Sequence, residues 1–171
     1  MIAPVAPKHL PLKSLAPPDT PRPHVVFGKI GEREYVSNTY FLVILPPGVA
    51  PPKGIEAHGY YEVRPTRALL KPVPTEEHIL KSLEATGEPI WAAPTRRKQV
   101  WVEVGYKRVR LTAYRISKGK SARKVRSAWI DCVKHLWPGC YWTFNPVKNC
   151  AFALADGVAV ASVMLLTANV T

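Results

Sequence analysis

The sequence has too few cysteines for a disulfide framework and no apolar run long enough to cross a membrane. Its three cysteines are an odd number, and a disulfide-stabilised chain of 171 residues would need more of them. The longest apolar stretch, residues 151–166, is interrupted by Asp156 and Gly157 and falls short of the about 18 residues of a transmembrane helix. The first residues lack the basic region and apolar run of a signal peptide. We therefore expect a cytoplasmic protein with reduced thiols and no membrane partner.

Patterns of catalytic residues are also missing. The three aspartates, Asp19, Asp131 and Asp156, are too scattered for a carboxylate-based hydrolase or a two-metal nuclease. Of the phosphate-binding Walker pattern only Gly119-Lys120-Ser121 is present, which does not predict nucleotide hydrolysis. No stretch matches an RNA recognition motif, a KH loop, a C2H2 finger or the Rossmann glycine pattern. We expect no enzyme and no cofactor.

The cysteines leave two alternatives open. Cys132, His135, Cys140 and Cys150 are spaced C-x2-H-x4-C-x9-C. This spacing shares only its first intervals with the zinc knuckle, C-x2-C-x4-H-x4-C, and without a paired C-x2-C we expect no metal. A catalytic thiol would need Cys140 or Cys150 beside a base such as His135 or His58, in an electropositive pocket. The spacing alone does not show such a pairing.

Acidic residues are nearly absent from one stretch of the chain, residues 96–126. This stretch holds twelve of the 24 Lys and Arg residues and one of the 12 acids, Glu103, and so carries a charge of +11. The rest of the chain contributes +1 to the net charge of +12. Such a concentration of bases attracts phosphate-rich or otherwise acidic partners. The alternative is a solvated face that aids solubility.

The order of predicted elements indicates an α+β fold with a mainly antiparallel sheet, one long and one short helix, and a Pro-rich N-terminal arm. Residues 1–23 hold seven of the 18 prolines and are expected to form an extended arm, with a single domain over residues 24–171. Strands are predicted at 25–27, 35–45, 55–63, 140–145, 149–155 and 158–166, and two more within 100–116, separated by a bend at 105–106. Helices are predicted from Thr75 to Gly87 and over 121–137. On the second helix Ile130 falls among the cations, which predicts an exposed apolar contact.

The basic stretch also holds aromatic residues, and its period-two pattern predicts one apolar face and one face of arginines and aromatics. Cations neutralise phosphates, and Trp101, Tyr106 and Tyr114 would offer stacking surfaces to bases. The alternative for Trp101 and Tyr114 is that they simply cover the outer face of the sheet. The loop 117–121 leads into the predicted start of the long helix, where the helix dipole favours anions. The predicted nucleic-acid-binding residues are Lys107, Arg108, Arg110, Tyr114, Lys118, Lys120, Arg123, Lys124 and Arg126.

The sequence is therefore best interpreted as a nucleic-acid-binding accessory protein, acting on DNA or RNA through a basic hairpin, loop and helix surface. Phosphate contacts would dominate, with weak sequence preference. The alternative is a protein-interaction module, an inhibitor or regulator that docks on an acidic partner. In that case the basic stretch would steer association, and the Pro-rich arm would add an extended docking segment.

Overall fold

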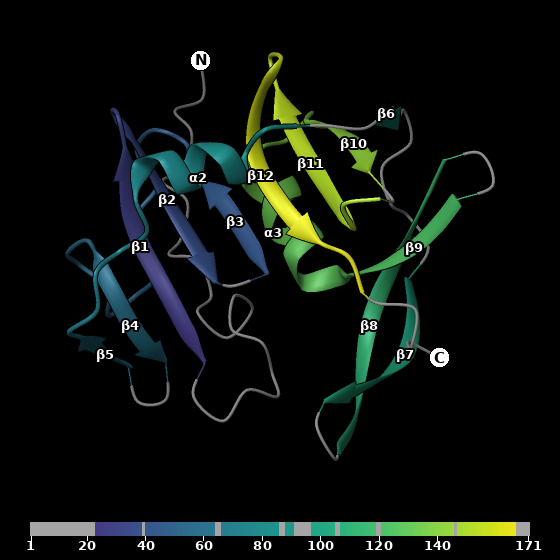
Figure 1. The fold of residues 1–171 in the computed structure, drawn as a ribbon, viewed down its shortest axis with the longest axis horizontal. Coiled ribbons are helices and arrows are strands. Elements are labelled where there is room, and N and C mark those ends of the chain that lie inside the picture. The colour runs from purple at the N-terminus through teal and green to yellow at the C-terminus, as the bar shows by residue number, and fades with distance from the viewer. Residues whose placement is uncertain are drawn as a thin grey trace, which may run out of the picture. The chain divides into compact units, whose positions relative to one another are not determined.

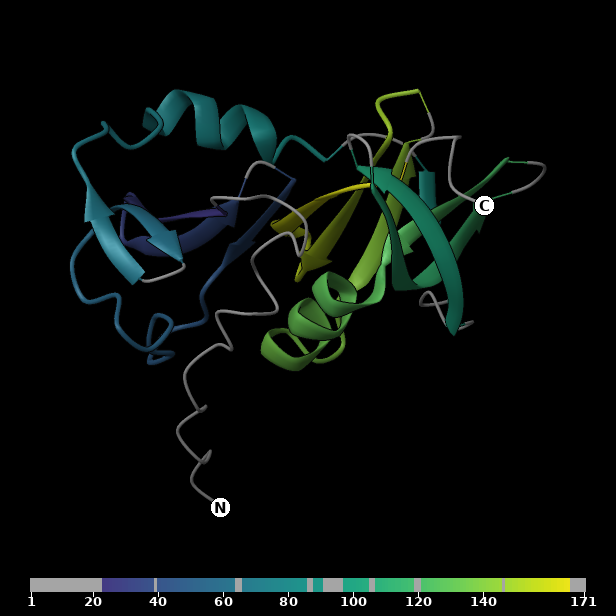
Figure 2. The same ribbon diagram turned by 90° about the horizontal axis from the view of Figure 1, so that it is seen from below.

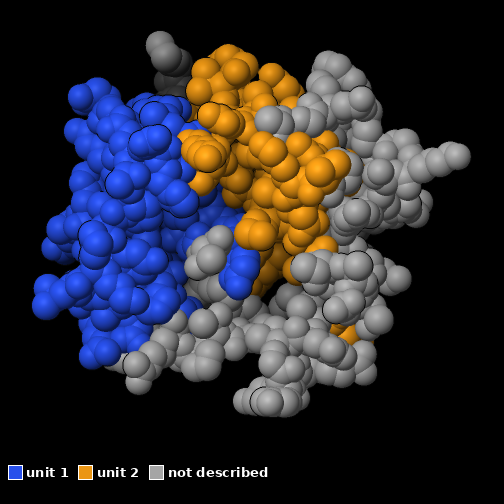
Figure 3. Space-filling model, in the orientation of Figure 1, with its two compact units in different colours: residues 1–80 blue, residues 81–171 orange. Residues whose placement is uncertain are grey.

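A computed structural model describes residues 23–166 except for 39, 64–65, 86–87, 91–96, 105–106, 119–120 and 146. Within strands, only the backbone is described at 88–90, 97–100, 102–104, 107–109, 111–112, 115–118 and 121–124. The chain divides into two compact units, residues 1–80 and 81–171, which are coloured separately in Figure 3. The single domain predicted over 24–171 stays a prediction. The predicted Pro-rich arm lies outside the described residues, apart from Pro23.

The first unit is an antiparallel sheet in the order β5-β4-β1-β2-β3 (Figure 1). Its strands are β1 (His24–Ile30), β2 (Arg33–Asn38), β3 (Phe41–Ile44), β4 (Gly59–Val63) and β5 (Thr66–Leu69). The alternation of apolar residues gives each face of the sheet a buried set. One face buries Val25, Phe27, Val36 and Val43, and the other buries Val26, Tyr35, Leu42 and Ile44.

Two local features of this unit correct or extend the sequence-based expectations. The single strand predicted over 35–45 is wrong, because β2 and β3 form a hairpin there. Asn38 ends β2, and its Oδ1 accepts a hydrogen bond from the backbone N–H of Tyr40 at 2.7 Å, which favours a turn over a continued strand. At the other end of the sheet, the N–H of Val63 donates to the carbonyl of Pro23 at 3.0 Å. Pro23 therefore takes part in the strand pairing of this unit.

The short helix α2 (Glu76–Ser82) crosses the boundary between the units and confirms the predicted N-terminal signal. The Thr75 hydroxyl accepts a hydrogen bond from the N–H of His78 at 3.2 Å, and Glu76 and Glu77 occupy the first turn. Ile79 is buried. Neither this helix nor the longer one, within the described ranges of the chain, combines the length and apolarity needed to span a bilayer.

The second unit contains one antiparallel sheet in the order β12-β11-β10-β6. Its strands are β6 (Glu88–Ile90), β10 (Tyr141–Asn145), β11 (Cys150–Ala155) and β12 (Val158–Met164). The predicted turn at 156–157 is confirmed, since Asp156 and Gly157 have φ values of 50° and 77°, as a two-residue hairpin loop requires. One face of this sheet is almost entirely excluded from solvent, through Trp142, Phe144, Ala151, Ala153, Ala161 and Val163.

The second unit also contains a three-stranded antiparallel sheet in the order β7-β8-β9, followed by helix α3. The strands are β7 (Arg97–Val104), β8 (Lys107–Lys118) and β9 (Ser121–Arg126), and α3 spans Ser127–Leu136. The α+β class and the predicted pair of strands around residues 105–106 are therefore confirmed. The helix predicted over 121–137 is wrong in its first part, because residues 121–126 form β9.

Helix α3 packs against β8, β9 and β12, and lies beside the first sheet of this unit in Figure 2. Packing against both sheets buries a broad apolar surface, formed by Trp129, Ile130, Val133 and Leu136. The exposed contact predicted at Ile130 is therefore wrong, since that side chain is 0% exposed. The cations at 123 and 126 that made its surroundings look polar lie on β9 and not on the helix.

Candidate nucleic-acid interface

Strand β8 has twelve residues and changes its hydrogen-bonding partner along its length. It pairs with β7 from Lys107 to Tyr114 and with β9 from Ala113 to Lys118. Only Ala113 and Tyr114 have a paired residue on both sides. The part of β8 that includes Arg110 is therefore a two-stranded ribbon with β7, and in Figure 1 this ribbon runs away from α3.

The pairing register sorts the basic residues onto two faces, because residues directly opposite each other share a face and successive residues alternate. We call the two faces the Trp101 face and the opposite face. Basic positions on the Trp101 face are Arg97, Arg108, Arg110, Lys118 and Arg123, with Glu103 as the acid. Basic positions on the opposite face are Lys98, Lys107, Arg115, Lys124 and Arg126.

The residues predicted from the sequence to form one surface are thus divided. The register places Arg108, Arg110, Tyr114, Lys118 and Arg123 on the Trp101 face, and Lys107, Lys124 and Arg126 on the opposite face. Lys120 lies outside the described residues. The division arises because residues 121–126 form a strand and not a helix. Successive residues of a strand alternate between two faces, so Arg123 lies on one face and Lys124 and Arg126 lie on the other.

A signal for β9 was present in the sequence. The pairing of Lys118 with Ser121 leaves two residues between the strands, Gly119 and Lys120. A two-residue connection whose first residue is glycine is a common hairpin loop. The same pattern, Gly105-Tyr106, separates β7 from β8, where Val104 pairs with Lys107. Gly119-Lys120 therefore predicts a hairpin between β8 and β9, just as Gly105-Tyr106 predicts the hairpin between β7 and β8.

Trp101 and Arg110 form the best described part of the Trp101 face. They are direct partners across β7 and β8, which brings their Cβ atoms within about 5.5 Å of each other. Trp101 is 44% exposed and Arg110 is also exposed. The ion pairs among the described residues are Lys29–Glu32, His58–Glu34 and Arg67–Glu62, and none of them involves Arg110. An exposed aromatic side chain and an exposed cationic side chain thus start from directly opposed positions of the ribbon.

Tyr114 lies further along the same face, but its ring is only 5% exposed. Its hydroxyl donates a hydrogen bond to Oδ1 of Asp131 on α3, at 2.6 Å. This burial corrects the expectation that Tyr114 offers its ring to a base. Val125, its partner on β9, is also buried. Tyr114 therefore fastens β8 to α3 and marks the end of the exposed part of the Trp101 face.

Arg126 is half-buried at the junction of β9 and α3. It precedes the first helical residue and makes no side-chain capping bond, and its guanidinium carbon lies 5.3 Å from the centre of the Trp129 ring. At that distance the cation and the ring attract each other. Because β9 separates loop 117–121 from α3, the helix N-terminus predicted to follow that loop is not there.

Burial disfavours the thiolate form of all three cysteines. Burial raises the pKa of the Cys132 thiol from 9.0 to about 12. Burial also raises the pKa values of Cys140 and Cys150, against the opposing effects of Lys134 and Lys148. A raised pKa lowers the fraction of reactive thiolate at a given pH. Across the described part of the chain, no group of three or more His, Cys, Asp or Glu residues is arranged to hold a metal ion.

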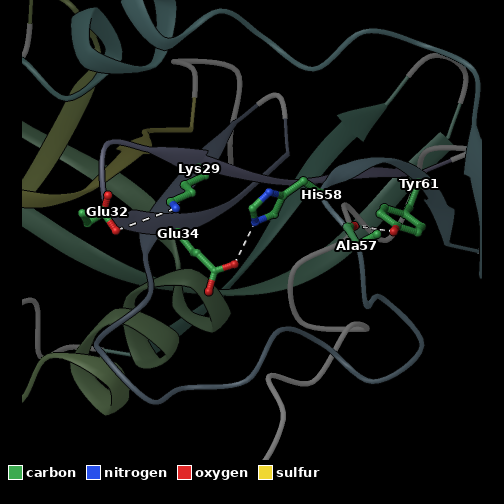
Figure 4. A network of polar contacts seen from close by, with 6 residues as sticks. All are labelled: Lys29, Glu32, Glu34, Ala57, His58 and Tyr61. Carbon is green, nitrogen blue, oxygen red and sulfur yellow. Dashed lines mark hydrogen bonds and ion pairs between the residues drawn. The ribbon is translucent and has the colours of Figure 1, made fainter.

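Polar contacts in the first unit join Lys29 and His58 to nearby carboxylates (Figure 4). His58 Nε2 lies 2.8 Å from a carboxylate oxygen of Glu34, and the ring of His58 packs edge-on against Phe27. Lys29 Nζ lies 3.8 Å from a carboxylate oxygen of Glu32. Both contacts are exposed to solvent.

No family model, no curated protein and no solved structure matches this chain.

Proposed function

We propose that the protein binds nucleic acid through the Trp101 face of the β7–β8 ribbon. The observation that carries the proposal is the pairing of an exposed tryptophan with an exposed arginine, Trp101 with Arg110. Four further basic positions share that face with only one acid, Glu103. Cations of this density neutralise phosphates and release counterions, which gives an affinity that falls steeply with salt.

The test is binding of the purified, nuclease-treated protein to labelled oligonucleotides over a salt series. We expect tight binding at low salt and a linear fall of log K with log salt concentration. Arg110→Glu should weaken binding to every sequence and reduce the steepness of the salt dependence by about one phosphate contact.

The matched control is Arg33→Glu, which makes the same change of charge at an exposed arginine of the first unit. Its effect should be small, because Arg33 lies on a different sheet from the proposed interface. Absence of binding at low salt, or equal losses in Arg110→Glu and Arg33→Glu, would contradict the proposal. A stable protein complex that survives nuclease treatment would then favour an acidic protein partner.

A further inference from the structure

We infer that the ligand of the Trp101 face is single-stranded nucleic acid, with an unpaired base stacked on Trp101 and a neighbouring phosphate bound by Arg110. This inference rests on the proposed function and narrows its ligand. It comes from the exposure of Trp101, from its register with Arg110, and from the width of the sheet at that point.

The first argument is the exposure of Trp101. The other tryptophans whose side chains are described are less accessible: Trp129 is 5% and Trp142 is 1% exposed, and Trp137 is half-buried. Trp101 is 44% exposed, and Arg110, the residue of β8 that pairs with it, is charged and exposed. The exposed part of this large aromatic ring can stack on a base.

The second argument separates single strands from duplexes. In a duplex the faces of the bases are stacked on one another, and only their edges are accessible in the grooves. Arginine reads such edges and contacts phosphates, but an indole face gains nothing comparable from them. An unpaired base presents its whole π-face. Stacking of this kind tolerates any sequence, and its removal weakens binding by about ten- to a hundredfold.

The third argument is the arrangement of the strands around the pair. Next to Arg110, β8 is paired with β7 alone, because its pairing with β9 begins at Ala113. Along this face the side chains of Trp101 and Arg110 are exposed, and the ring of Tyr114, four residues further along β8 than Arg110, is buried. Four residues of strand span about 13 Å, which leaves room for a few nucleotides along the ribbon and supplies a boundary at α3.

The experiment compares two probes and two substitutions at one position. The full-length protein is titrated at low salt with a labelled oligothymidine of about 20 nucleotides, longer than the footprint of about 4 to 16 nucleotides of common single-strand-binding domains. The second probe is a duplex of equal length. Trp101→Ala removes the ring, and Trp101→Phe keeps a smaller aromatic face. Circular dichroism is used to check that each variant is folded. We expect both to be folded, because Trp101 is exposed.

We expect wild-type protein to bind the single strand more tightly than the duplex. Trp101→Ala should weaken single-strand binding by about tenfold or more, Trp101→Phe should weaken it far less, and neither should change duplex binding by more than about twofold. An oligouridine probe tests RNA in the same way, and an equal dependence on Trp101 supports the inference for either sugar.

Two other outcomes have distinct meanings. If the duplex binds at least as tightly, and Trp101→Ala changes neither probe while Arg110→Glu weakens both, the single-strand inference is overturned and the proposed function stands. If neither probe binds at low salt, both the inference and the proposed function are overturned.

Discussion

The two units of the chain use charge in different ways. Residues 1–80 contain nine basic and seven acidic residues, a balance of +2, whereas residues 81–171 contain fifteen and five, a balance of +10. All three ion pairs among the described residues lie in the first unit. The contrast shows that the net charge of +12 says little by itself, because the excess belongs to one sheet of one unit.

The contrast extends to what the charged residues touch. Glu62 has a side chain only 8% exposed, and it accepts a hydrogen bond from Arg67 at 2.6 Å. A buried carboxylate of this kind needs a partner to offset its lost hydration. Arg110 is exposed and its direct strand partner is Trp101. Charge in the first unit therefore serves the fold, and we propose that charge on the ribbon serves a ligand.

The largest expected effect concerns thiol reactivity, which reports on the second unit alone because all three cysteines lie there. With its pKa raised from 9.0 to about 12, Cys132 should have about a thousandfold less thiolate at pH 8 than an ordinary thiol. Labelling with a chromogenic disulfide at pH 8 should therefore modify Cys140 and Cys150 well before Cys132. Equal labelling rates for all three without denaturant would contradict the burial of Cys132.

The same raised pKa has a consequence for stability. The folded state holds the Cys132 proton more tightly than the unfolded state does, so this contribution is fully present below pH 9 and is lost as the pH rises toward 12. If unit 2 opens independently of unit 1, alkaline pH should speed the labelling of Cys132 before it changes any probe placed in unit 1.

The next effect compares the loss of stability when a tryptophan is removed from the core and from the ribbon. Trp142→Ala, at a side chain 1% exposed, should lower the free energy of unfolding by about 3–5 kcal/mol, because it removes a large buried ring and leaves a cavity. Trp101→Ala, at a side chain 44% exposed, should lower it by less than about 1 kcal/mol. Urea denaturation measures both. Similar losses in the two variants would mean that the ribbon tryptophan is part of the core.

The smallest effect compares two arginines. Arg67→Ala removes one partner of the Glu62 carboxylate and should destabilise the protein by about 1 kcal/mol. The loss is modest because the Arg67 side chain is itself 62% exposed and water screens the pair. Arg110→Ala should leave the denaturation midpoint unchanged and reduce oligonucleotide binding. The comparison between the units fails if Arg110→Ala is the more destabilising of the two.

Much of the fold could be predicted from local patterns. The turn at Asp156-Gly157, the cap at Thr75 and the hairpin at residues 105–106 each follow from residue preferences within a few positions. The division of 35–45 into two strands was missed because the β-branched and aromatic residues continue on both sides of Asn38. There the turn depends on side-chain hydrogen bonds made by Ser37 and Asn38.

The candidate site was predictable in its residues but not in its geometry. The charge pattern identified the basic stretch, and alternation identified the ribbon with Trp101. The sequence predicts a helix over 121–137 because Val125 continues the helical spacing of Ala128 and Trp129. A strand spacing fits Val125 equally well, and only the pairing of residues 121–126 with β8 decides between them. The burial of Tyr114 depends on contact with α3, where its partner Asp131 lies 17 residues further along the chain.

The change of pairing partner along β8 divides the hydrogen bonds of this sheet into two nearly separate sets. Peeling β7 away from residues 107–112 of β8 leaves the β9 pairing intact, and peeling β9 from residues 115–118 leaves the β7 pairing intact. Only Ala113 and Tyr114 hold both neighbours, and both are buried. The three strands therefore form two hairpin ladders that share one pair of residues. Local opening of one ladder would leave the hydrogen bonds of the other in place.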